Sequence, residues 1–397
     1  MADTADMTDA DYGRRLARTR EAIAQAGLDG LLIASQYNRR YLTGFTAHDG
    51  DITESSGWVL VTPSTFGLVA GTFQLSGVED EIVPSGVQVL STDKALPWSV
   101  VADAVKADGV RRLGFEKDWL SYDRFARVRD ALNETVGADA ELLPADDLVV
   151  MVRAIKDAAE IATMRRAADV ADDAFEQLLT EIKVGMTERE IASLLEQHMV
   201  ELGASGVSFP TIVACGPGGA QPHAVPTDRP VRAGEPLLID FGCRVDGYCS
   251  DTTRTFCIGE PDPKLVELYN IVRRAQDAGF KALADGVRRG RDVDAAARAV
   301  IEEAGYGEQY FHSLGHGVGL AIHELPVTAK LRIQTPEADA EMAKREQLEP
   351  DTVITNEPGI YIPGWGGVRL EDMVLVGDDG FEIMTTRNPE HVRSIAG

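Results

Sequence analysis

The chain has 397 residues, of which 44% are hydrophobic and 26% are charged, an ordinary composition for globular domains. This length allows two domains that each bury a core of their own. Acidic residues outnumber basic residues by 64 to 39, and the formal charge of −25 argues against nucleic acid or an anionic membrane as a partner. Such an excess of acid is also compatible with a salt-rich cytoplasm.

The beginning of the chain and its cysteines favour a cytoplasmic location. The first residues are polar and acidic and lack the regions of a signal peptide. No apolar run approaches the ~18 residues of a membrane-spanning helix. The cysteines form no C-x-x-C pair, so we expect reduced thiols rather than a zinc site at Cys215, Cys243, Cys249 and Cys257.

The N-terminal part alternates between helical and strand-like patterns. Residues 11–27 have helical spacing and end on a glycine. Short apolar runs predict strands at 30–35, 58–63, 66–71, 87–90 and 111–116. This alternation predicts an α/β layer domain, and the segment contains no glycine-rich phosphate loop.

Residues 142–160 carry the chain out of this domain and into a long helix. We therefore place the boundary near residue 150, which divides the chain into domains of residues 1–150 and 151–397. The second domain begins with helices and becomes strand-like and glycine-punctuated after residue ~205.

Two segments of the second domain, 176–203 and 282–305, share one plan: a helix end, a glycine turn and a helix that ends in glycine. Thr187 and Glu190 form a capping box at the start of the second helix in the first segment. The pattern fits a duplicated α+β unit, which would place strands from both halves around a shared cleft. Two unrelated helical hairpins explain the pattern equally well.

Two aspartates follow strand-like sequence in the segment 237–256. Asp240 ends an apolar run, and Asp251 follows a second run after the turn at Asp246-Gly247, a strong hairpin signal. A hairpin would bring the two carboxylates together, and they would repel each other unless a cation or proton lay between them. Taken alone, the pair could also be strand-end residues without a ligand.

Two glutamates lie in similar sequence. Glu357 precedes Pro358-Gly359 at the end of a strand-like run, and Glu371 interrupts the apolar sequence around it. An acid is costly to bury without a partner, so a cation would resolve both placements. Positions on the surface face of a strand would resolve them too.

Three of the seven histidines, His312, His316 and His323, fall in the segment 311–326. His316 stands among glycines, where the backbone can approach a metal closely. The H-E-x-x-H motif of zinc peptidases is absent, because Leu-Pro-Val follows His323-Glu324.

Together, the four carboxylates and one neutral imidazole balance the charge of two divalent cations. Oxygen-rich ligation with one nitrogen suits Mn²⁺, Fe²⁺, Co²⁺ or Zn²⁺ better than a thiolate-binding metal. Two such ions about 3.5–4 Å apart would bridge a water and lower its pKa.

The whole constellation resembles the dinuclear metallopeptidases of the M24 family, which includes creatinase, aminopeptidase P and Xaa-Pro dipeptidase (prolidase). The five candidate ligands appear in the family's order, with "HGVG", "NEPG" and "RLED" around the last three. Residues 14–45 and 153–175 are similar, more loosely, to the family's N-terminal domain and first catalytic helix. The resemblance implies a creatinase-like α/β domain followed by an α+β pita-bread catalytic domain, and a homodimer.

The resemblance also implies a role for each ligand. Asp240 would hold one metal, and Asp251 and Glu371 would bridge both. His316 and Glu357 would complete the second site. Mn²⁺ is the metal that we expect at both sites, with Co²⁺, Zn²⁺ and Fe²⁺ as alternatives.

Further residues match the family's active site. His223 matches a substrate-binding histidine, His323 one that stabilises the tetrahedral intermediate, and Arg369 an arginine that supports the metal site. Tyr361 stands where family members often have an active-site tyrosine. His312 has no assigned counterpart, and we expect it to be a structural histidine or one at the edge of the substrate site rather than a direct catalytic group.

The mechanism that follows is a hypothesis. A hydroxide bridged by the metals attacks the scissile carbonyl, and Glu357 accepts and passes on the proton. His323 and His223 donate hydrogen bonds to the oxygen that becomes charged.

The expected function is that of an exopeptidase acting on Xaa-Pro bonds, of the aminopeptidase P type. A prolidase is the alternative. It needs a basic group for the carboxylate of proline, and the candidates after His323 are Lys330 and Arg332. Metal-free creatinase-type or ectoine-hydrolase-type enzymes and non-catalytic peptide-binding modules are disfavoured by the retained ligands, and methionine aminopeptidase by the long N-terminal domain.

Overall fold

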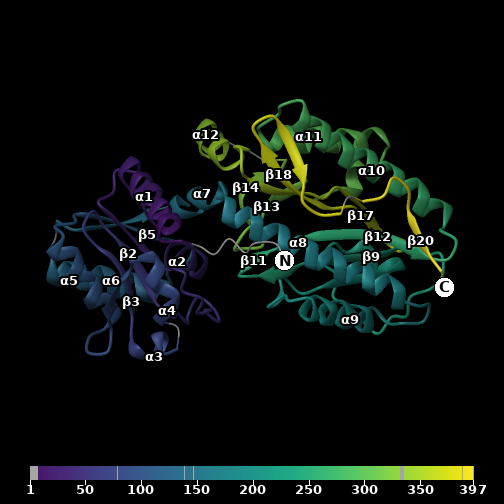
Figure 1. Cartoon of the computed structure of the whole chain (residues 1–397). Coiled ribbons are helices and arrows are strands. Elements are labelled where there is room, and N and C mark those ends of the chain that lie inside the picture. Colours follow the sequence, from purple (N-terminus) through teal and green to yellow (C-terminus); the bar gives the residue numbers. More distant parts are fainter. Residues whose placement is uncertain are drawn as a thin grey trace. The chain divides into compact units, whose positions relative to one another are not determined.

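The structure is a computed structural model that describes residues 8–77, 79–137, 139–145, 147–330, 335–386 and 388–396. Arg332, one of the two basic residues considered for carboxylate binding, lies outside these residues. The contacts between residues divide the chain into two compact units (Figure 1). We call residues 5–153 the N-terminal unit and residues 154–397 the C-terminal unit.

The N-terminal unit is built on a six-stranded mixed sheet with the order β4-β3-β2-β1-β5-β6. Its strands are β1 (Gly30–Ile33), β2 (Trp58–Val61), β3 (Phe66–Ala70), β4 (Gln88–Ser91), β5 (Arg112–Glu116) and β6 (Glu141–Ala145). Its helices are α1 (Asp9–Gln25), α2 (Gln36–Thr43), α3 (Thr72–Leu75), α4 (Glu79–Ile82), η1 (Val83–Ser85), α5 (Pro97–Ala107), α6 (Tyr122–Thr135) and α7 (Leu148–Ala154), the last of which ends at the border of the unit. The expected α/β domain is therefore present.

The C-terminal unit contains two pairs of long helices, α8 (Ala158–Glu181) with α9 (Glu188–Glu201), and α10 (Pro263–Ala284) with α11 (Gly290–Glu303). The capping box at the start of α9 is confirmed, because the Thr187 amide donates to Glu190 at 2.8 Å and the Glu190 amide donates back to Thr187 at 3.2 Å. Shorter helices are η2 (Gly216–Ala220), η3 (Gly307–Gln309) and α12 (Pro336–Arg345).

The strands of this unit form two larger sheets, with the orders β20-β12-β9-β8 and β14-β13-β15-β18-β19, and two small ones, β11-β10-β7 and β16-β17. They are β7 (Gly206–Val207), β8 (Ile212–Cys215), β9 (Leu237–Phe241), β10 (Cys243–Val245), β11 (Tyr248–Cys249), β12 (Thr252–Ile258), β13 (Gly315–Gly317), β14 (Glu324–Thr328), β15 (Val353–Asn356), β16 (Gly359–Ile362), β17 (Gly366–Arg369), β18 (Asp372–Gly377), β19 (Gly380–Ile383) and β20 (Arg393–Ile395).

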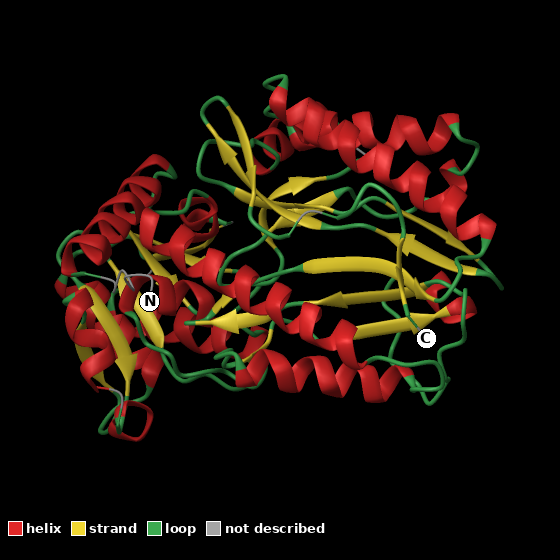
Figure 2. Cartoon of the chain, turned by 45° about the vertical axis from the view of Figure 1, so that its right-hand side comes forward, coloured by secondary structure: helices red, strands yellow, loops and turns green. Residues whose placement is uncertain are grey.

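The helix pairs lie on the two outer sides of the C-terminal unit, with the sheets between them (Figure 2). One core joins α8 and α9 to the first sheet, and in it Phe175 stacks on Phe241 with ring centres 5.1 Å apart. A second core joins α10 and α11 to Ile354 of β15 and Val374 of β18. This arrangement, in which each helix pair covers its own sheet, is the one that a duplicated α+β unit predicts.

The predicted hairpin is present as β10 and β11. Asp246 and Gly247 at its turn have φ angles of 47° and 82°, the left-handed pair that a two-residue hairpin turn requires. The hairpin returns the chain beside β9, where Asp240 pairs with Thr253 of β12.

The four cysteines are buried free thiols, as expected. Among the residues that the structure describes, no helix is long and apolar enough to cross a membrane.

Candidate metal centre

The five candidate ligands come from both halves of the C-terminal unit. Asp240 lies in β9 and Asp251 directly precedes β12, whereas His316 lies in β13, Glu357 follows β15, and Glu371 separates β17 from β18. Asp240 pairs with Thr253, and Asp251 is two residues before Thr253. Because side chains alternate along a strand, the two aspartates reach the same face of the sheet.

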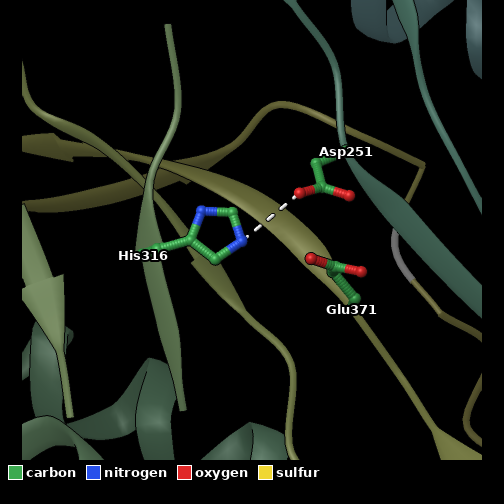
Figure 3. A group of neighbouring side chains, drawn as sticks. All are labelled: Asp251, His316 and Glu371. Atoms are coloured by element: carbon green, nitrogen blue, oxygen red, sulfur yellow. Dashed lines mark ion pairs between the residues drawn. The ribbon is translucent and has the colours of Figure 1, made fainter. Parts of the chain in front are cut away.

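Three of these side chains form a compact group. One ligand atom from each of Asp251, His316 and Glu371 lies within 4.8 Å of the others (Figure 3). Nε2 of His316 is 3.5 Å from Oδ2 of Asp251 and also 3.5 Å from Oε1 of Glu357. These separations leave room for a cation between groups that make no direct hydrogen bond to one another.

His316 is held in the form that a metal requires. Its Nδ1 lies 3.1 Å from the carbonyl oxygen of Gly317, so the ring proton sits on Nδ1 and the lone pair of Nε2 faces the carboxylates. Burial, and then the nearby His323, lowers the pKa of His316 to about 3, which keeps the ring neutral.

The carboxylates of the centre repel one another when they are charged. Burial raises the pKa of Asp251 well above its usual range, and the charges of Glu371, Asp240 and Glu357 raise it further. The pKa of Glu371 is raised in the same way, by burial and then by Glu357 and Asp240. Burial raises the pKa of Glu357 to about 8. Four acids that share one buried site and disfavour each other's charge are what a dication would stabilise.

One acid has an opposite charge beside it. Nη2 of Arg369 donates to Oδ2 of Asp240 at 2.5 Å, but burial still raises the pKa of Asp240. The other oxygen of Asp240, Oδ1, is buried and accepts no hydrogen bond. A buried oxygen without a donor is costly unless a cation contacts it.

A threonine that the sequence did not single out links this arginine to Glu371. Oγ1 of Thr253 donates to Oε2 of Glu371 at 2.6 Å and accepts from Nε of Arg369 at 2.9 Å. The signal that could have found Thr253 is its spacing, two residues after Asp251 on the same face of the strand.

Tyr361 and His312 extend this network. Nη1 of Arg369 donates to the Tyr361 hydroxyl at 2.8 Å, and that hydroxyl lies 2.9 Å from Nε2 of His312. Nδ1 of His312 is 2.7 Å from the Ser313 carbonyl, which places the ring proton on Nδ1 and makes Nε2 the acceptor of the tyrosine proton. His312, for which the sequence supplied no counterpart, is therefore connected to the centre through Tyr361 and Arg369.

The other two histidines that the sequence singled out, His223 and His323, border the centre. The ring of His323 meets that of His316 edge to face, with centres 4.2 Å apart. Burial and then the nearby His223 lower the pKa of His323. His223 also acts electrostatically on Asp240, whose pKa it lowers. Both residues are exposed, so a ligand at the centre could reach them.

The residues present fit a metal. Four carboxylates and a neutral imidazole converge at the centre, and one buried oxygen of Asp240 accepts no hydrogen bond. The group of possible metal ligands found among the described residues contains none of the four buried cysteines. Oxygen ligands with one nitrogen are typical of Mn²⁺, Fe²⁺, Co²⁺ and Zn²⁺ sites.

Comparison with known proteins identifies two family models along the chain. The model described as metallopeptidase family M24 matches residues 162–378, and the creatinase/prolidase N-terminal domain matches residues 15–155. A peptidase of Bacillus subtilis (strain 168) is 36% identical over 371 residues, which cover 94% of this chain and 97% of that protein.

Two solved structures are similar to nearly the whole chain. A Xaa-Pro dipeptidase from Bacillus anthracis is 37% identical, with a TM-score of 0.83, over 97% of this chain and 100% of that one. An X-Pro aminopeptidase from Thermotoga maritima MSB8 is 31% identical, with a TM-score of 0.79, over 95% of this chain and 100% of that one. These similarities confirm the expected creatinase-like and pita-bread domains. The chain belongs to metallopeptidase family M24 and is a metal-dependent peptidase.

Proposed function

We propose that this protein is a dinuclear-metal exopeptidase that hydrolyses Xaa-Pro bonds, with Mn²⁺ as its metal. The observation that supports it most strongly is the convergence of Asp251, His316 and Glu371, with Asp240 and Glu357 beside them, in a chain similar to two Xaa-Pro peptidases. Metal-free relatives would not need four acids buried together.

In this proposal Asp240 would hold one metal, Asp251 and Glu371 would hold both, and His316 and Glu357 would complete the second site. Two divalent cations would polarise the scissile carbonyl and lower the pKa of a water. Arg369 and Thr253 orient Asp240 and Glu371 through the hydrogen bonds described above.

The protein's own groups then handle the proton and the charge. Glu357, whose pKa lies near 8 in the absence of metal, takes up a proton from the attacking water and passes it on to the leaving nitrogen. His323 and His223 donate hydrogen bonds to the oxygen that becomes negative. Tyr361 and His312 hold Arg369 in place from the other side.

Between the two Xaa-Pro activities, we propose the aminopeptidase type, with cleavage before proline in longer peptides. A dipeptidase would need a basic group for the proline carboxylate. Lys330 is two-thirds exposed and lies 3.7 Å from Glu302, so it is engaged at the surface. The similarity to the Bacillus anthracis dipeptidase is the observation that favours the alternative. A cytoplasmic homodimer completes the proposal.

The test is a substrate panel of Ala-Pro, Gly-Pro, Ala-Pro-Ala and Ala-Ala-Ala with the Mn²⁺-loaded protein. We expect release of alanine from Ala-Pro-Ala and little turnover of the dipeptides or of Ala-Ala-Ala. Preferential cleavage of the dipeptides would establish the dipeptidase instead. A metal-loaded protein that cleaves none of the proline peptides would contradict the proposed function.

A further inference from the structure

We propose that Glu188 is a positioning residue that holds the segment of residues 216–226, and with it His223, against the metal centre. This inference rests on the proposed function for the role of His223. Glu188 is the first residue of α9 and is only 3% exposed, although it contacts none of the metal ligands.

The Glu188 carboxylate accepts three hydrogen bonds from outside its own helix. Oε1 accepts from the backbone amide of Cys215 at 2.8 Å. Oε2 accepts from the amide of Thr227 at 2.9 Å and from the Thr227 hydroxyl at 2.6 Å. Hydrogen bonds to a charged acceptor are about twice as strong as neutral ones, so this one side chain binds both Cys215 and Thr227 firmly to the start of α9.

These two partners lie at the ends of one loop. Cys215 is the last residue of β8, and Thr227 follows the stretch that contains η2 and His223. Three glycines, Gly216, Gly218 and Gly219, lie in this stretch and would leave an unsupported loop with large conformational freedom. By closing both ends on one carboxylate, the fold removes much of that freedom before a substrate arrives.

The middle of the loop rests on β17, the strand that carries Arg369. A methyl group added at Gly367 of β17 would come within 2.1 Å of the carbonyl oxygen of Gly219, so the two backbones touch directly. Nη1 of Arg369 lies 3.4 Å from the carbonyl oxygen of Pro222, next to His223. The same guanidinium contacts Asp240. Because both ends of the loop are bound by Glu188 and its middle packs on β17, His223 has a defined position beside the centre.

A carboxylate is needed because all three partners are donors. Glutamine at this position keeps the length of the side chain but provides one acceptor oxygen and an NH₂ group that would face a backbone N–H. One end of the loop would lose its acceptor, whereas the metal ligands would keep every contact. The effect on catalysis should therefore come chiefly through His223.

The test compares Glu188→Gln with Glu190→Gln, which removes the same charge two residues later at an exposed position. Hydrogen exchange of residues 215–227 should accelerate in Glu188→Gln and stay at the wild-type rate in Glu190→Gln. This readout needs no substrate, so it separates failure of the inference from failure of the proposed function. Unchanged exchange in Glu188→Gln would overturn the inference.

The kinetic arm uses a double-mutant cycle with His223→Ala in the Mn²⁺-loaded protein. We expect Glu188→Gln to lower kcat/KM about 10- to 100-fold in the wild-type background and less than about 2-fold once His223 is absent. Bound metal should remain at the wild-type level. Equal factors in both backgrounds would show a general structural role and contradict the proposal.

Thr227→Val, which removes only the hydroxyl donor, provides a milder variant in case Glu188→Gln does not fold. It should show faster exchange over the same residues and an intermediate decrease in kcat/KM. Wild-type exchange and wild-type kinetics in this variant would contradict the inference.

Discussion

Two buried acidic sites, one in each unit of the molecule, have opposite surroundings. In the N-terminal unit, Glu116 accepts hydrogen bonds from the amides of Ala34 and Ser35 at 2.8 and 2.7 Å and from the side chain of Asn38. In the C-terminal unit, Asp251 and Glu371 face each other and further acids across a buried space.

Burial raises the pKa of Glu116 as it does that of the metal-centre acids. The direction of a pKa shift therefore does not distinguish the two cases, but the neighbours do. An acid surrounded by N–H donors supports the fold, whereas acids surrounded by other acids indicate a cation.

Removal of metal should produce the largest difference between the two kinds of acid. We expect chelation to lower peptidase turnover by at least about 10³-fold, because the chemistry of the water and carbonyl depends on the cations. Addition of Mn²⁺ should restore it. Glu116→Gln is the matched control, and it should keep turnover while costing about 1–3 kcal/mol of stability. Full activity of the chelated protein in a metal-free assay would refute this expectation.

A change beside the centre should have the next largest effect. His323→Ala should lower kcat by about 10²- to 10³-fold, the usual consequence of losing one donor to a developing oxyanion. Metal content should not change, because His323 is not among the residues that we propose as ligands. Steady-state kinetics with metal analysis of the same sample checks both statements, and an unchanged kcat would remove His323 from the mechanism.

The pH dependence of stability should then separate the metal-free from the metal-loaded protein. The pKa of Glu357 is raised from the ordinary 4.5 to about 8 in the folded chain. Its protonation therefore stabilises the metal-free fold fully below about pH 4.5, and this contribution is lost as the pH rises through about 8.

We expect the Tm of the metal-free protein to fall over that window relative to the Tm of the metal-loaded protein, in which cations replace the protons. Glu357→Gln should reduce the difference. Parallel melting curves for the two forms across the window would show that the acids are not coupled to the cation in this way.

Salt should have the smallest effect, and one that is not confined to either unit. The formal charge is −25, so the acidic side chains of the folded chain repel one another. Salt near 1 M weakens this repulsion, because it shortens the screening length to about 3 Å. We expect the Tm to rise by a few degrees between about 0.1 and 1 M KCl while the number of bound metals stays constant. A falling Tm would mean that attractive surface pairs outweigh the net repulsion.

Much of the candidate centre could be predicted from the sequence because each candidate ligand lies in or beside a strand, within a distinctive motif. Asp240, Asp251, His316, Glu357 and Glu371 all reach one site. Five of the six strands of the N-terminal unit were predicted to within a few residues, from their short apolar runs. The sixth, β6 (Glu141–Ala145), was missed, because the stretch that begins at residue 142 was assigned to the path into a long helix. The order of the strands in the sheet was not predicted, because pairing depends on contacts between distant residues.

The supporting residues were missed for the same reason. Thr253 reaches the centre only because β12 pairs with β9 in one register. His312 is connected to the centre only because its ring meets Tyr361 of β16. Glu188 reads in the sequence as an ordinary acid in the first turn of a helix. Its partners, Cys215 and Thr227, become visible only when the chain is folded.

Metal stoichiometry tests the central claim most directly. We expect mass spectrometry of the purified protein, reconstituted with Mn²⁺ and then desalted, to show about two metals per active chain. Asp251→Asn should lose metal and turnover together, while Glu116→Gln retains both. A protein that hydrolyses Xaa-Pro peptides at full rate with no bound metal, or an Asp251→Asn variant that keeps two metals and full turnover, would contradict the account.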